Sequence, residues 1–197
     1  SVEYSNVGVE YYQAKNFKEA LGYMQKGIAL KQKYHPKEIK PQDRFNAMVC
    51  AKMINDYDLA LTFADSLLAT PKLTKDDRIK YLGQKVEILT IANKSKEALV
   101  LLDTLKMLDP TDPNLKLAEL QIYLNKDRNE DALILLNDIT KNLKNREDLW
   151  VIKGQLHYQK SQIDSSVKAF TNALILNKNN YSALYGLGVI YVNKGNE

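Results

Sequence analysis

The sequence predicts an all-α protein made of repeated pairs of helices, about five and a half in number. Three observations predict this class. The sequence repeats itself with a period near 34 residues, and apolar residues recur at helical spacing. Residues that favour the first turn of a helix occur where predicted helices begin. The repeat extends over essentially all of the 197 residues, so we expect a single array.

The internal repeat is clearest when residues 1–34 are aligned with residues 147–180 without a gap. An aromatic residue then occupies the fourth place in both segments, and a glycine occupies the eighth. The second halves match as well, with a small residue at the twentieth place and a large apolar residue at the twenty-fourth. The matched pairs are Tyr4 and Trp150, Gly8 and Gly154, Ala20 and Ser166, and Met24 and Phe170.

A small residue in the predicted second helix of each complete pair defines the frame of the array. Successive repeats start 40, 38, 34, 34 and 34 residues apart, so the first two are stretched. The last repeat has a first helix with an apolar face and no polar capping helix, so we expect a fragment of a longer protein. The small residues are Ala20, Ala60, Ala98, Ala132 and Ser166, and the repeats lie near 1–34, 41–74, 79–112, 113–146, 147–180 and 181–197.

Local signals agree with this frame. Pro41 and Pro113 suit the first turn of a helix, and residues 74–77 resemble a capping box. Pro36 makes a continuous helix through its neighbours unfavourable. Apolar residues recur at spacings of three and four in two of the second helices, namely Ala98, Leu101, Leu102 and Leu105, and Ala132, Leu135, Leu136 and Ile139.

The spacing of these residues resembles the tetratricopeptide repeat (TPR), a helix-turn-helix unit with Trp, Leu-Gly, Tyr, Ala, Phe, Ala and Pro at fixed places. The resemblance implies a right-handed TPR superhelix, a solenoid of αα-hairpins whose first helices line a concave groove. Val86 and Leu120 depart from it, because the family prefers glycine or alanine at the eighth place. We therefore predict looser packing or a shifted register in the third and fourth repeats.

The resemblance also implies a function, a non-catalytic scaffold that binds a peptide or protein segment in the groove. Most of the implied groove residues are apolar, and Asn46, Gln121 and Gln155 could bond an extended backbone. The alternative for each side chain is packing against the next repeat. The implied groove residues are Val9, Tyr12, Phe45, Asn46, Val49, Met53, Leu117, Gln121, Val151, Gln155, Tyr158 and Tyr185, together with Gln13, Lys52, Glu87, Ile91, Leu124 and Val189.

Two further functional hypotheses come from the same resemblance. The chain could be a regulatory or docking module fused to an effector domain beyond residue 197, such as a kinase or a DNA-binding domain. A TPR subtype clamps the C-terminal carboxylate of chaperones, but only Asn46 and Lys80 match its five clamp positions. Chaperone tails are therefore not expected as partners, and the identity of the partner and the oligomeric state stay open.

No catalytic residue, metal site or cofactor is expected. His35 and His157 lie in different repeats, and Cys50 lies in an apolar helix as a small hydrophobic residue. The glycines do not form a phosphate-binding cluster. A lone cysteine also excludes an internal disulfide.

Charge and hydropathy exclude two other classes of protein. The net charge is +4, with the excess between residues 26 and 52, where a patch could meet an acidic partner or simply be solvated. Because the predicted groove is apolar and nearly neutral, nucleic-acid binding is not expected.

The apolar runs are far shorter than the roughly 20 residues of a membrane span, so we expect a soluble protein. The chain begins with Ser1 and not methionine, which leaves both a cytoplasmic and an exported or periplasmic location open.

Overall fold

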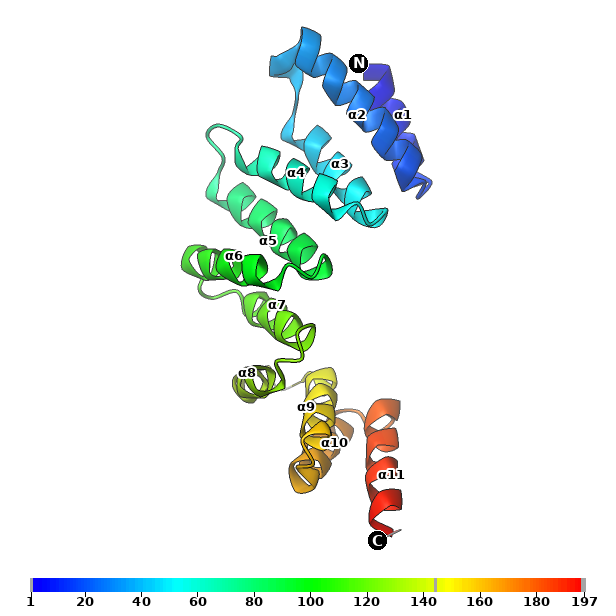
Figure 1. The fold of residues 1–197 in the computed structure, drawn as a ribbon, viewed down its shortest axis with the longest axis vertical. Helices are drawn as coiled ribbons and strands as arrows, with labels where there is room; N and C mark the ends of the chain where they lie inside the picture. Colours follow the sequence, from blue (N-terminus) through cyan, green and yellow to red (C-terminus); the bar gives the residue numbers. More distant parts are fainter. Residues whose placement is uncertain (1, 144, 196–197) are drawn as a thin grey trace. The chain divides into compact units, whose positions relative to one another are not determined.

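The computed structural model describes residues 2–143 and 145–195, and every regular element in these ranges is a helix. The predicted all-α class is therefore confirmed (Figure 1). Ser1, Lys144, Asn196 and Glu197, which include both ends of the predicted array, lie outside the described residues. The helices are α1 (Val2–Gln13), α2 (Phe17–Tyr34), the 3-10 turn η1 (Pro36–Glu38), α3 (Pro41–Met53), α4 (Tyr57–Leu68), α5 (Lys75–Ile91), α6 (Ser95–Leu108), α7 (Pro113–Leu124), α8 (Asn129–Asn142), α9 (Glu147–Gln159), α10 (Ile163–Leu176) and α11 (Tyr181–Gly195).

The chain divides into two compact units, Ser1–Ile122 and Tyr123–Glu197, with the division inside α7. In the first, the N-terminal unit, α1 packs on α2, α3 on α4, and α5 on α6, and each pair also contacts the next. In the second, the C-terminal unit, α9 packs on α8 and α10, and α11 packs on α10 and α9. The single array expected from the sequence stays a prediction.

The helix starts follow the local signals in the sequence. Pro41 and Pro113 are the first residues of α3 and α7, where a missing backbone donor costs nothing. Thr74 caps α5, because its hydroxyl accepts a hydrogen bond from the backbone N–H of Asp77 at 3.1 Å. Pro36 begins a short 3-10 turn after α2 has ended at Tyr34, so the predicted break is confirmed.

The two long repeat intervals have different structural causes. The second helices of the pairs begin at residues 17, 57, 95, 129 and 163. The first interval contains an α2 of 18 residues and the turn η1. The second contains an α5 of 17 residues, compared with 12 or 13 in the other first helices of complete pairs. The extra residues extend α5 at its N-terminal end, because the Thr74 cap starts the helix before residue 79.

The five turns inside the helix pairs share one backbone feature. Each has a residue with positive φ two places before the second helix begins, although none of the five is glycine. Asn and Asp tolerate this left-handed conformation better than most residues, and they occupy three of the five turns. The five residues are Lys15, Asn55, Asn93, Asp127 and Ser161.

The small residues that define the repeat frame lie at the contacts between paired helices. All five, from Ala20 to Ser166, have no exposed surface. A Cβ atom on Gly8 would lie 3.0 Å from Met24 Cγ, so a larger residue there would require a shift of a few tenths of an ångström. In the third pair, Val86 takes this place and is itself buried in the core of the N-terminal unit. Leu120 is also buried.

None of the described helices is both long enough and apolar enough to cross a bilayer.

Candidate peptide-binding surface

A hollow of about 440 Å³ between α9 and α11 contains three of the predicted groove residues of the C-terminal unit. Gln155 and Tyr158 come from α9, and Tyr185 comes from α11. Val189, which the resemblance also placed in the groove, lies beside them. The remaining lining residues are Gln159, Phe170, Ser182 and Gly186.

Phe170 forms the apolar floor of this hollow and holds the three helices around it together. Its side chain is only 2% exposed. A Cβ atom added to Gly154 would lie 2.7 Å from the Phe170 ring, and one added to Gly186 would lie 2.5 Å from it. Both glycines are therefore required for α9 and α11 to approach the ring from α10.

The two glycines of α11 differ in their surroundings. Gly186 approaches the Phe170 ring of the preceding helix pair, whereas a Cβ atom on Gly188 would have no neighbour within 4 Å.

A hydrogen bond ties the same region together from inside. The Ser166 hydroxyl donates to the carbonyl oxygen of Gly154 at 2.8 Å, and both residues are buried. This bond lies between α10 and α9 and satisfies a hydroxyl that would otherwise be unpaired in the core. The serine at the small-residue place therefore adds a polar contact that alanine could not make.

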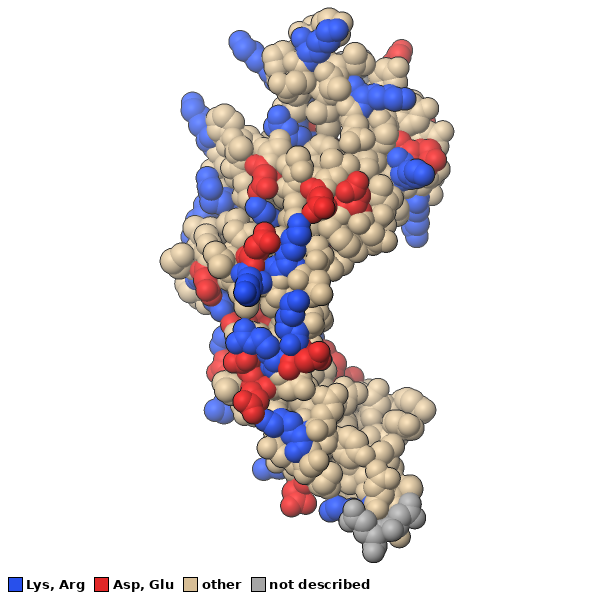
Figure 2. Space-filling view, viewed as in Figure 1, with Lys and Arg blue, Asp and Glu red and all other residues tan. Residues whose placement is uncertain are grey.

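The rim of the hollow is aromatic and polar, and none of the lining residues is charged. Tyr185 is 65% exposed and stacks on Tyr181, with ring centroids 6.2 Å apart. The amide of Asn193 donates to the Tyr158 hydroxyl at 2.9 Å, which fixes the orientation of that ring. Figure 2 shows an uncharged surface over much of α11, whereas charged groups of both signs mix over the N-terminal unit. Exposed aromatic surface with adjacent amides suits a partner with an apolar side chain and a free backbone.

One predicted groove residue of this unit is not accessible. Val151 is only 7% exposed and packs in a core cluster with Phe170, Ala173, Ala183 and Ile190. Val151 therefore packs against the first helix of the next repeat, the alternative that the sequence left open. The reason is the close approach of α11 to α9, which covers this position.

Near the start of the N-terminal unit, the predicted groove residues line little open space. Val9 and Asn46 border a hollow of only about 30 Å³ between α1, α2 and α3. The Asn46 side-chain oxygen already accepts a hydrogen bond from Gln42 at 2.6 Å. Tyr12 packs edge-on against Phe17, with ring centroids 5.7 Å apart. Tyr12 and Asn46 therefore contact residues of their own repeats, whereas Val9 is 38% exposed.

Further along the N-terminal unit, the predicted groove residues are partly covered by charged side chains. The Lys80 ammonium lies 4.3 Å from the centre of the Phe45 ring, and Lys52 pairs with Glu87 at 3.0 Å. Both contacts occupy positions that the resemblance assigned to ligand binding. The remaining predicted positions are half-buried at Val49 and Leu117 and exposed at Met53, Ile91 and Gln121. Leu124, in the other unit, is half-buried.

The residues that could carry chemistry are separated from one another. In the described ranges, no three His, Cys, Asp or Glu side chains are grouped to hold a metal ion. His35 is exposed near Glu38, and His157 contacts Gln162 through its Nδ1 at 2.7 Å. Burial raises the pKa of the Cys50 thiol to about 11, so it is a poor nucleophile at neutral pH.

Similar proteins are found by comparing structures and not by comparing sequences. No protein-family model and no curated protein matches the sequence. The fold is similar to that of MamA from Desulfovibrio magneticus RS-1 (residue 41 to the end), with a TM-score of 0.69 and 17% identity over 90% of this chain and 95% of that one. It is also similar to YrrB, described as a TPR protein with an unusual peptide-binding site. The TM-score is 0.64, and the identity is 15% over 94% of this chain and 90% of that one.

The chain has a TPR-like fold. At these identities the similarity establishes the architecture of this TPR-like protein, and the binding site has to be argued from its own residues.

Proposed function

We propose that this TPR-like protein is a non-catalytic scaffold that binds a peptide or protein segment, and that the α9–α11 hollow is a site where it does so. The supporting observation is the lining of the hollow, where Gln155, Tyr158 and Tyr185 surround the buried Phe170 floor. These residues come from two helices, and the resemblance had assigned all three to a binding groove.

The chemistry of the hollow defines the kind of segment that fits it. The Tyr185 ring and the half-buried Val189 side chain offer apolar surface to one inserted aliphatic or aromatic side chain. The exposed amides of Gln155 and Gln159 can donate to and accept from the backbone of an extended chain beside that side chain. The partner we expect is therefore an uncharged, extended segment with an apolar anchor. YrrB, which has a similar fold, is described as binding peptides.

Selection of peptides from a phage-displayed random library on the full chain tests the proposal. Selected peptides should carry an aromatic or large aliphatic anchor, and their affinity should be measured by isothermal titration calorimetry. Tyr185→Ser should weaken binding at least about tenfold, which corresponds to roughly 1.4 kcal/mol, because Tyr185 is the most exposed aromatic residue of the lining and its ring would be covered by the anchor.

Tyr191→Ser is the matched control on the same helix. Tyr191 is 60% exposed, close to the value for Tyr185, but it does not line the hollow. Binding should be unchanged in this variant, and circular dichroism should show equal helicity in both. If peptides lose the same affinity in both variants, or in neither, the α9–α11 hollow is not the site.

A further inference from the structure

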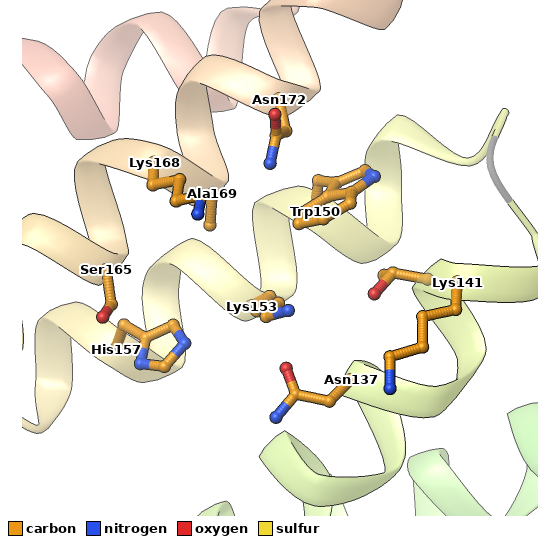
Figure 3. Close-up of a pocket in the computed structure, with 10 residues that line it drawn as sticks. Asn137, Lys141, Trp150, Lys153, His157, Ser165, Lys168, Ala169 and Asn172 are labelled. Atoms are coloured by element: carbon orange, nitrogen blue, oxygen red, sulfur yellow. The ribbon is translucent and has the colours of Figure 1, made fainter.

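A second hollow, of about 570 Å³, lies in the C-terminal unit between α8, α9 and α10 (Figure 3). It faces the side of α9 opposite to the α9–α11 hollow, since Trp150, Lys153 and His157 fall about half a turn away from Gln155, Tyr158 and Gln159. The residues that line it are Asn137, Thr140, Lys141, Trp150, Lys153, His157, Ser165, Lys168, Ala169 and Asn172.

Three lysines, one from each helix, give this hollow a positive charge. They are Lys141 of α8, Lys153 of α9 and Lys168 of α10, and none of the lining residues is an aspartate or glutamate. Within the described residues no carboxylate pairs with any of the three. Lys160, in the same unit, instead pairs with Glu130 at 2.8 Å.

The three charges are close enough to affect one another. Burial lowers the pKa of Lys153, and the charges of Lys168 and Lys141 lower it further. The Lys153 ammonium lies 4.8 Å from the centre of the Trp150 ring, close enough for a cation–π contact. An anion placed among the three ammonium groups would remove the repulsion between them.

Uncharged hydrogen-bond donors surround the lysines. The side chains of Asn137, Asn172 and Ser165 point toward the hollow and make no hydrogen bond to another described residue (Figure 3). The other hydroxyl in the lining is already used, because Thr140 donates to the Leu136 carbonyl oxygen at 2.7 Å. The hollow therefore combines three cations with several neutral donors and no competing acidic group.

We propose that the Lys141–Lys153–Lys168 hollow binds a dianionic phosphate group, either free or as a monoester. Three oxygen atoms and a charge near −2 match three ammonium groups better than a single carboxylate does. The volume exceeds that of a phosphate ion, so there is room for the group that carries it. The charge is confined to one hollow, which favours a discrete phosphate over a nucleic-acid backbone.

Intrinsic fluorescence offers a direct test because Trp150 lines the hollow and is the only tryptophan of the chain. The full chain is titrated with inorganic phosphate, with O-phosphoserine, and with a phosphoserine peptide and its unphosphorylated form. Sodium chloride at equal ionic strength serves as the reference. The expected result is a saturable change in Trp150 emission with the phosphate compounds only.

A charge-matched pair of variants locates the site. Lys168→Gln should weaken phosphate binding at least tenfold, since it removes one of the three cations. Lys18→Gln makes the same change of net charge on an exposed residue of α2 and should leave binding unchanged. If Lys168→Gln fails to fold, as judged by circular dichroism, Lys141→Gln provides the same test from α8.

The relative affinities identify the source of the phosphate. Tighter binding of the phosphoserine peptide than of O-phosphoserine would indicate a phosphorylated protein, and equal binding would indicate a small molecule or free phosphate. The proposal is overturned if chloride reproduces the emission change or if both glutamine variants bind alike. None of these outcomes affects peptide binding at the α9–α11 hollow, so the two proposals fail separately.

Discussion

Phe170 shows how one side chain can organise three helices. Its ring lies against Gly154 of α9 and Gly186 of α11, and both contacts are closer than any Cβ atom would permit. The same ring forms the floor of the α9–α11 hollow. Stability and the proposed binding site therefore depend on the same packing contact.

We predict that Gly154→Ala destabilises the C-terminal unit by about 1 to 3 kcal/mol, because the added methyl group overpacks a closed contact with Phe170. The free energy of unfolding is to be measured by urea denaturation. Gly83→Ala is the control, since Gly83 is also helical and an added Cβ meets nothing within 4 Å. It should stabilise by up to about 1 kcal/mol through helix propensity. Equal effects in both variants would contradict the packing described for Phe170.

At the scale of the element, short-range signals determine where each helix begins. Proline starts α3 and α7, and Thr74 starts α5. Residues with positive φ mark the turns inside the pairs, as at Asn55 and Asn93. Each of these features depends on residues within a few places along the chain, so each repeat has its own start and turn.

Thr74→Ala should lower the stability of the N-terminal unit by about 1 kcal/mol, because the backbone N–H of Asp77 loses its cap. Thermal denaturation followed by circular dichroism measures the loss. Thr62→Ala is a matched control within α4, where an exposed threonine donates only to the carbonyl oxygen of Asp58. Its effect should stay within about 0.5 kcal/mol. A loss as large as that of Thr74→Ala would show that the cap is not the cause.

At the scale of the whole molecule, helices contact their neighbours along the chain and few others. The contacts of the N-terminal unit run from α1 to α6 in order, and those of the C-terminal unit run from α8 to α11. In such repeat architectures, stability is close to a sum over adjacent pairs. A local change should therefore have a local effect.

Two natural probes test this expectation, one in each unit. Cys50 is the only cysteine and has no exposed surface, and Trp150 is the only tryptophan. With a thiol pKa of about 11, labelling of native Cys50 by a thiol reagent should be slow at pH 8 and speed up as pH rises towards 11 or as the unit unfolds. In Gly154→Ala, the Trp150 transition should shift to lower urea while the midpoint for Cys50 labelling stays unchanged. A common shift of both would mean that the two units unfold together.

Much of the fold was predictable from the sequence because its causes are local. The spacing of small residues from Ala20 to Ser166 identified the helix pairs, and Pro36, Pro41 and Thr74 located helix ends. Gln155, Tyr158 and Tyr185, which the TPR resemblance placed in a groove, line one hollow, and peptide binding there stays a proposal. The extra residues of the second repeat interval were visible in the sequence, although their location in α5 was not.

By itself, the sequence determined the helical class, the repeat and the side of α9 that faces the α9–α11 hollow. The tertiary structure decided that Val151 is buried, that Gly186 meets Phe170, and that Lys141, Lys153 and Lys168 share one hollow. The physical reason is distance along the chain. Periodicity sets which face a side chain occupies on its own helix, whereas burial and electrostatic coupling depend on residues brought close from other helices.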